Sequence, residues 1–276
     1  FTRIHALIAL TAMTQAALAV ERLELPRADG RTATALHYPP AGICRGTAIL
    51  SHGAGGSENG LAYLAEFLQA SDWLVVVPGH AESGRKALLA HTPGLDIRAG
   101  LAALITDADA YRHRFSDIEA ARQWAQARCP GRFSAVIGHS MGAATVMLLA
   151  GARNRLGLDR RIDFDAYVAM SPQGVGAIFP PDAWSNISRP VYTLTGTEDR
   201  ELNAPWTARL QAYRDMQPGC KWLGVVDGAN HMAFGRGGTA AERKLIDWSV
   251  QAFLQAAQSG DCRNRWHAPG IRIEYK

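Results

Sequence analysis

The sequence Gly-His-Ser-Met-Gly at 138–142 constrains the fold of this chain more than any other feature. An apolar run that favours a β-strand, 133–137, precedes it, and a run of small and apolar residues that favours a helix, 143–150, follows. A serine between a strand and a helix takes strained backbone angles, and the flanking glycines leave room for the close chain crossing. The turn lifts the hydroxyl clear of the sheet, at the positive end of the helix dipole. Ser140 is therefore a candidate nucleophile; a serine in an ordinary glycine-flanked turn is the alternative.

Segments that favour strands alternate with segments that favour helices over the rest of the chain. Strands that are apolar throughout indicate a mostly parallel sheet with helices on both faces, and 47% hydrophobic residues suffice for one large core. We therefore expect a single α/β domain over 20–276. The expected strands are 21–25, 32–38, 47–51, 73–77, 133–137, 167–170, 191–195 and 222–226, and the expected helices include 117–128, with Ser116 as N-cap, and 240–258, with Thr239 as N-cap.

One long segment, 80–106, has no clear periodicity and is interpreted as a loop or lid. Its two histidines, His80 and His91, either line a pocket or lie on the surface. In a parallel α/β sheet, ligands bind beyond the carboxyl ends of the strands. Chemistry is therefore expected in the loops that follow strands.

A base and an acid to serve Ser140 are expected in later loops. A serine hydroxyl needs a base within hydrogen-bonding reach, and in sheets of this kind the chain order is serine, acid, histidine. His231, after the last expected strand, is the candidate base, with an ordinary surface histidine as the alternative. Asp199, after the preceding strand, is the candidate acid that orients the imidazole, and Glu198 competes with it. We expect Arg200 to hold this loop.

An acyl-transfer reaction also needs donors aimed at the developing oxyanion. The residue after the nucleophile supplies one backbone N–H, which assigns Met141. The second is expected from the glycine-rich loop at 52–56, where Ala54 is the first choice and Gly55 the fallback. This loop lacks the spacing and the Lys of a phosphate-binding P-loop. His52 is expected to support the loop backbone.

The net charge and residues 1–19 indicate which binding partners and which cellular compartment to expect. The net charge of +4 comes from dispersed Lys and Arg without a basic run, so we expect no nucleic-acid partner. Residues 1–19, with Arg3, the apolar run 4–10 and an Ala-Leu-Ala ending, are typical of a secretory signal peptide, with an ordinary first helix as the alternative. The stretch is short for a membrane span, so no stable membrane insertion is expected after cleavage. These features predict a secreted or periplasmic protein.

Four cysteines agree with export, and they allow three pairings. Cys44 and Cys129 each stand just before a strand, and the two strands are expected to be neighbours. Cys220 precedes the last core strand, and Cys262 follows the final helix, which returns towards the same edge of the sheet. The expected pairs are therefore Cys44–Cys129 and Cys220–Cys262, with unpaired buried cysteines as the alternative. A metal site is not expected, since no C-x-x-C pair or histidine cluster occurs.

Several of these segments resemble one known superfamily, the α/β-hydrolases. Within it, the chain is similar to the secreted dienelactone-hydrolase-like and platelet-activating-factor-acetylhydrolase-like serine esterases. The resemblance extends from about Thr47 to Phe253. The residues that carry it are 51–57 (Ser-His-Gly-Ala-Gly-Gly-Ser), 63–68 (Tyr-Leu-Ala-Glu-Phe-Leu), 73–79 and 138–142.

The resemblance implies an α/β-hydrolase fold and ester hydrolysis through an acyl-enzyme, with no metal or organic cofactor. It gives Ser140 the role of nucleophile, His231 that of base, and Ala54 and Met141 those of oxyanion donors. Dienelactone hydrolases proper use a cysteine nucleophile, so Ser140 argues against dienelactone substrates. Related acetylhydrolases can carry the acid after the earlier strand, but 170–173 (Met-Ser-Pro-Gln) holds no carboxylate, which leaves Asp199.

The expected protein is a serine ester hydrolase on an eight-stranded type of core with little or no cap. Roughly twenty residues separate the strand ending at Met170 from the one starting at Val191, too few for a large cap at about 1.5 Å per helical residue. An open site favours small to medium esters or polymer ends. The alternatives are a cutinase-like polyester hydrolase, which shares the Gly-His-Ser-Met-Gly turn, a serine peptidase or amidase, and a non-catalytic binding protein on the same fold.

Overall fold

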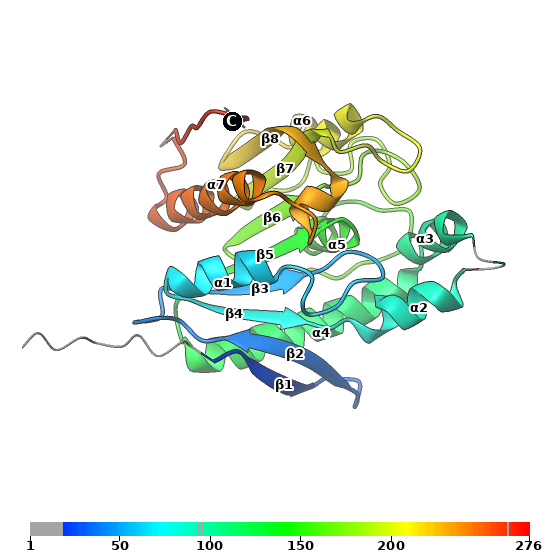
Figure 1. Cartoon of the computed structure of the whole chain (residues 1–276), viewed down its shortest axis with the longest axis horizontal. Coiled ribbons are helices and arrows are strands. Elements are labelled where there is room, and N and C mark those ends of the chain that lie inside the picture. The colour runs from blue at the N-terminus through cyan, green and yellow to red at the C-terminus, as the bar shows by residue number, and fades with distance from the viewer. Residues whose placement is uncertain (1–18, 93, 95, 264) are drawn as a thin grey trace, which may run out of the picture.

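The computed structural model describes residues 19–92, 94, 96–263 and 265–276 (Figure 1). The expected signal segment, 1–19, lies outside these residues apart from Ala19. Nine strands of the described chain form one sheet in the order β1-β2-β4-β3-β5-β6-β7-β8-β9. Their bounds are β1 Glu21–Pro26, β2 Thr32–Tyr38, β3 Gly46–Ser51, β4 Trp73–Pro78, β5 Phe133–His139, β6 Ala166–Met170, β7 Val191–Glu198, β8 Lys221–Asn230 and β9 Ile271–Tyr275.

The middle of this sheet is parallel and its edges are antiparallel. The strands from β4 through β3, β5, β6 and β7 to β8 pair in parallel, whereas β2 runs antiparallel to both β1 and β4. At the other edge β9 runs antiparallel to β8. With helices on both faces, this is the α/β-hydrolase fold expected from the sequence. The ninth strand was not expected, although its alternating Ile-Arg-Ile-Glu-Tyr sequence has the period of a half-exposed strand.

Seven α-helices and three 3-10 helices of the described chain surround the sheet. On one face, α4 and α5 pack on side chains such as Ile49 and Val136, and on the other, α1 and α7 pack on Leu50 and Ile137 (Figure 1). Alternate residues of each central strand therefore enter two separate cores. The helix bounds are α1 Ala62–Ala70, α2 Arg85–Ala90, α3 Ile97–Ile105, α4 Ala108–Arg128, α5 Met141–Leu149, α6 Gln211–Asp215 and α7 Ala240–Ser259, with the 3-10 helices η1 Ala81–Ser83, η3 Trp206–Leu210 and η4 His231–Phe234.

Two expectations about the segment before β5 were wrong. The segment 80–106 is not an irregular loop, because it holds η1, α2 and α3. Helix α4 begins at Ala108, where the Asp107 carboxylate accepts hydrogen bonds from the first-turn amides of Asp109 and Ala110. Ser116 therefore lies inside the helix, and its hydroxyl donates to the carbonyl of Arg112 instead of capping an N-terminus.

Helix α7 agrees with its sequence signals. The hydroxyl of Thr239 accepts from the amide of Glu242, and the Glu242 carboxylate accepts from the amide of Thr239, which makes a capping box. Among the described residues, no helix has both the length and the apolar character that crossing a membrane requires.

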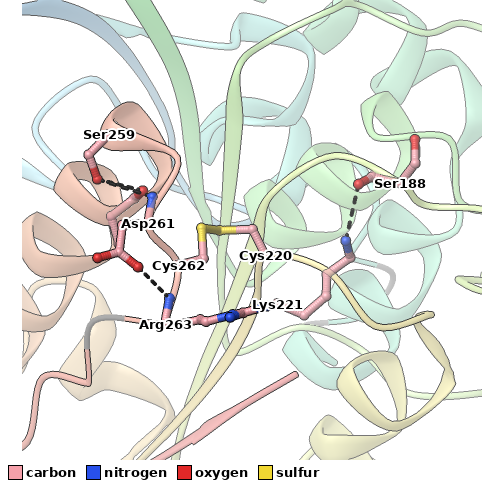
Figure 2. The surroundings of a disulfide bond; sticks show 8 residues. Ser188, Cys220, Lys221, Ser259, Asp261, Cys262 and Arg263 are labelled. Atoms are coloured by element: carbon pink, nitrogen blue, oxygen red, sulfur yellow. Dashed lines mark hydrogen bonds between the residues drawn. A yellow bond between two sulfur atoms is a disulfide. The ribbon is translucent and has the colours of Figure 1, made fainter.

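Both expected disulfides are present, and all four cysteines are paired. Cys44–Cys129 ties the segments that lead into β3 and β5, and Cys220–Cys262 ties the start of β8 to the chain beyond α7 (Figure 2). Both bonds lie at the amino ends of the parallel strands. They link chain segments at the end of the sheet opposite to the loops that follow Ser51, His139, Glu198 and Asn230.

Candidate active site

Ser140 occupies a strained turn between β5 and α5. Its backbone angles are φ 58° and ψ −118°, in a region that residues with a side chain rarely adopt. A Cβ on Gly138 would lie 2.1 Å from the carbonyl oxygen of Gly142, and a Cβ on Gly142 would lie 2.0 Å from that of Ser51. Only glycine fits at these two positions, so the turn expected from the sequence is formed.

A continuous chain of hydrogen bonds runs from Ser140 through His231 to Asp199. The Ser140 Oγ lies 2.9 Å from Nε2 of His231, and Nδ1 of the same ring lies 2.9 Å from Oδ1 of Asp199. His231 begins η4 directly after β8, and Asp199 directly follows β7, so neighbouring parallel strands deliver both side chains to one edge of the sheet. The Asp199 side chain is fully buried, whereas that of His231 is 34% exposed. With Nδ1–H donated to the carboxylate, Nε2 is free to accept from the serine.

The carboxylate of Asp199 has further partners besides His231. Thr195 donates its hydroxyl to Oδ2 at 2.9 Å, and Nε of Arg209 lies 2.9 Å from Oδ1. Burial acts to raise the pKa of Asp199, but the hydrogen bond from His231 and the positive charge of Arg209 outweigh it and lower this pKa below its ordinary value. The group therefore stays ionised at neutral pH. Glu198, the alternative acid, is exposed to solvent.

Arg209, in η3, is the residue that holds the acid loop. Its guanidinium is almost fully buried and donates to the carbonyl oxygens of Asp199 at 2.7 Å, Ser171 at 2.9 Å and Arg200 at 3.0 Å. The expectation that Arg200 holds this loop was wrong, because its side chain is exposed and only its backbone oxygen takes part. Arg209 thus ties the loop after β7 to the loop after β6, in addition to its ion pair with Asp199.

The two candidate oxyanion donors belong to chain segments that lie next to the serine. The glycine-rich loop passes so close that a Cβ on Gly53 would lie 3.2 Å from the Cβ of Ser140. Within the described part of the chain, the backbone N–H groups of Ala54 and of Met141, the first residue of α5, have no protein acceptor. The N–H of Gly55, the fallback, already donates to the carbonyl of Ser83 at 2.9 Å. The geometry therefore favours Ala54 over Gly55.

His139, inside the strained turn, does more than pack. Its Nε2 lies 2.9 Å from the carbonyl oxygen of His231, and the two imidazole rings are 4.8 Å apart. Burial, with the nearby His231 as a smaller cause, lowers the pKa of His139 to about 3, so the ring is neutral and donates Nε2–H to that carbonyl. This bond fixes the backbone that carries His231.

Among the described residues, no group of three or more His, Cys, Asp or Glu side chains is placed to hold a metal ion. The groups around Ser140 form an arrangement that can pass a proton between a hydroxyl and an imidazole. It combines a hydroxyl, an imidazole, a buried carboxylate and two unoccupied backbone N–H groups.

Comparisons with known proteins bear on the fold. No protein-family model matches this chain, and no curated protein sequence matches it. Among solved structures, the esterase Pf2001 of Pyrococcus furiosus is similar, with a TM-score of 0.59 over 93% of this chain and 99% of the esterase. The two sequences are 15% identical, so the likeness establishes a shared fold.

Proposed function

We propose that this protein is a serine ester hydrolase that works through an acyl-enzyme. The observation that carries the proposal is the hydrogen-bonded chain from Ser140 through His231 to Asp199, with the serine in a turn that only glycines on both sides permit. The structural neighbour from Pyrococcus furiosus is described as an esterase, which supports the same class of reaction. Ser140 is the nucleophile, His231 the general base and Asp199 the orienting acid.

In the proposed mechanism, Ser140 Oγ attacks the ester carbonyl carbon while Nε2 of His231 removes its proton. The negative charge that develops on the carbonyl oxygen is stabilised by the N–H groups of Ala54 and Met141 and by the dipole of α5. His231 then gives the proton to the departing alkoxide, which leaves as an alcohol. A water molecule repeats the sequence on the acyl-serine, and the acid is released with Ser140 restored. Asp199 stabilises the imidazolium formed in each half.

We propose small to medium esters as substrates. In the described chain, the segment 171–190 between β6 and β7 contains no helix, and about a third of the His231 side chain is open to solvent. An open site of this kind accommodates soluble esters without a lid that must first move.

The disulfides support a proposal about the compartment in which the protein works. Two disulfide bonds are typical of proteins in an oxidising compartment. We propose that 1–19 is removed during export and that 20–276 folds as one domain. Mass spectrometry of the protein from a secreting host tests this, with Val20 as the expected first residue.

The direct test is hydrolysis of p-nitrophenyl esters from acetate to palmitate by the wild-type protein and by Ser140→Ala. Ser116→Ala, a serine inside α4 whose hydroxyl donates only to its own helix, is the matched control. Wild-type and control proteins should hydrolyse the short esters, and Ser140→Ala should lose about 10³-fold or more of that activity. Hydrolysis of amides alone would favour a peptidase, and hydrolysis of polymer films over soluble esters a polyester hydrolase. A folded protein with no turnover would contradict the proposal.

A further inference from the structure

A buried polar network lies behind the glycine-rich loop, and the proposed mechanism does not use it. At its centre is Arg114 on α4, whose side chain is entirely inaccessible to solvent. Burying a guanidinium is costly unless its donors are all matched with acceptors. The acceptors that Arg114 binds therefore indicate which part of the structure its burial stabilises.

The donors of Arg114 converge on the loop that follows β3. Nη1 donates to the carbonyl oxygen of His52 at 2.7 Å and to the hydroxyl of Ser51 at 3.1 Å. Nη2 donates to the carbonyl oxygen of Gly53 at 3.4 Å, and Nε donates to the hydroxyl of Ser83 at 2.7 Å. Two consecutive peptide groups of the loop, those of His52 and Gly53, are thus held by one rigid fork.

The carbonyl of Gly53 matters because it shares a peptide group with the N–H of Ala54. A trans peptide is planar, so its C=O and N–H point in opposite directions. The Gly53 oxygen is turned inward, since it accepts from the amide of Gly56 at 3.1 Å and from Arg114, and Nδ1 of His52 lies 2.7 Å away. The N–H of Ala54 therefore points away from the donors that bind the Gly53 oxygen, and Gly53 itself lies beside Ser140.

A second set of buried residues meets Arg114 at the hydroxyl of Ser51. His80 lies with Nε2 3.0 Å from the hydroxyl of Ser51 and Nδ1 2.9 Å from Oδ2 of Asp117. The other carboxylate oxygen of Asp117 accepts from Arg27 at 3.0 Å. These side chains are almost wholly inaccessible to solvent. His80 therefore belongs to the buried network, and its inaccessible side chain agrees with neither sequence-based alternative, a pocket lining or the surface.

We propose that Arg114 is a positioning residue for the oxyanion hole. It holds the peptide group between Gly53 and Ala54 so that the Ala54 N–H meets the charge that develops on the substrate carbonyl, and it does not touch the substrate. The inference rests on the proposed function of Ser140. A positioning role differs from a purely structural one because losing the Arg114 fork should weaken stabilisation of the transition state more than binding of the substrate.

The test compares Arg114→Gln and Arg114→Lys with the wild type, and uses Arg122→Gln on the same helix as control. Arg122 pairs with Glu119 away from the glycine-rich loop. In Arg114→Gln, kcat on the best p-nitrophenyl ester should fall by about 100-fold, the effect of losing one oxyanion donor, with KM within about threefold of the wild type. Affinity for an alkylboronic acid, a tetrahedral mimic, should fall by a similar factor. Arg114→Lys should recover part of kcat, and Arg122→Gln should keep all of it.

Several results would overturn the inference. One is a folded Arg114→Gln protein whose kcat stays within about twofold of the wild type. Another is a loss of kcat with undiminished boronate affinity. If Arg114→Gln does not fold, Arg114→Lys decides, because its charge is retained while the fork is lost; an unchanged kcat there also refutes the role. An inactive wild-type protein that binds no boronate would speak against the proposed function itself, which separates the two failures.

Discussion

Replacing Asp199 with asparagine tests the acid and its buried arginine in one experiment. The wild-type carboxylate, fully buried, binds His231, Thr195 and Arg209 at 2.9 Å each. Asparagine has nearly the same shape but no charge. Its amide oxygen can still accept from the imidazole, but it has no charge to stabilise the imidazolium, and Arg209 is left as a buried charge without a counterion.

This geometry predicts the size of the loss of activity and of the fall in thermal stability. Activity should fall by about 10⁴-fold, the size of loss seen when the orienting carboxylate of such a triad becomes an amide. Removing one partner of a buried ion pair costs about 3–5 kcal/mol, because the other charge stays desolvated. At about 2–4 °C per kcal/mol for a chain of this size, Tm should fall by roughly 6–20 °C. Ser140→Ala removes no buried charge and should change Tm by much less.

The assay is p-nitrophenyl acetate turnover beside thermal unfolding for Asp199→Asn, Arg209→Gln and the double variant. The double variant should regain part of the lost Tm, since it removes the stranded charge, but none of the activity. The stability gap between the wild type and Asp199→Asn should also depend on pH. Because the pKa of Asp199 is lowered in the folded state, the contribution of its charge is fully present above about pH 4 and is lost as pH falls through the lower folded pKa.

Either of two results would refute this reasoning. If Asp199→Asn keeps activity within about tenfold of the wild type, Asp199 is not the orienting acid. The exposed Glu198 is then the candidate for that role. If Tm is unchanged while activity is lost, the charge of Arg209 does not depend on Asp199, and the stabilising role given to this pair is wrong.

Further predictions concern the serine turn, the half-buried carboxyl group of Asp247 and the disulfides. Gly142→Ala places a methyl 2.0 Å from a backbone oxygen and should cost about 3 kcal/mol or more in urea unfolding, whereas Gly176→Ala, with nothing within 4 Å, should change stability by less than about 0.5 kcal/mol. Burial raises the pKa of Asp247 to about 7, so wild-type stability should decline as pH rises from about 4 to 7, and Asp247→Asn should raise Tm at about pH 8 but not at about pH 4. Reducing both disulfides should lower stability by up to roughly 4 kcal/mol each, with kcat of the folded protein unchanged, because both lie at the sheet edge opposite Ser140.

The serine turn and the order of the strands were predictable from sequence because their signals are local. A strand, Gly-x-Ser-x-Gly and a helix occupy consecutive residues, and a parallel sheet brings the later loops to the same edge. The positions of His231 and Asp199 followed from chain order alone, and the structure brings both to Ser140. The cysteine pairs followed in the same way, from which strands are neighbours.

The buried arginines could not be predicted, because sequence offers no sign that they leave the surface. Arginine is almost never fully buried unless it is paired, and many of the acceptors of Arg209 and Arg114 are backbone carbonyls, which residue types do not reveal. The acceptors of Arg114 also lie far along the chain, at His52 and Gly53. Contacts of this kind depend on tertiary packing and not on local periodicity.

The early start of α4 and the last strand were missed for a different reason. The buried Tyr111, Phe115 and Ile118 of α4 have the i, i+4, i+7 spacing of one helix face, but charged residues separate them and the stripe continues past Ser116. Ser116 followed by Asp117 imitated an N-cap, although Asp107 is the residue that caps. Strand β9 is short and lies at an edge, where half of its side chains face solvent.

The central claim, that Ser140 is a nucleophile activated by His231, is tested most directly by covalent labelling with a fluorophosphonate and peptide mapping. The account predicts one label per chain, located on Ser140, and labelling that slows by about 10³-fold or more in His231→Gln. Labelling should also be absent in Ser140→Ala. A folded wild-type protein that takes no label, or that carries it on a residue other than Ser140, would contradict the account.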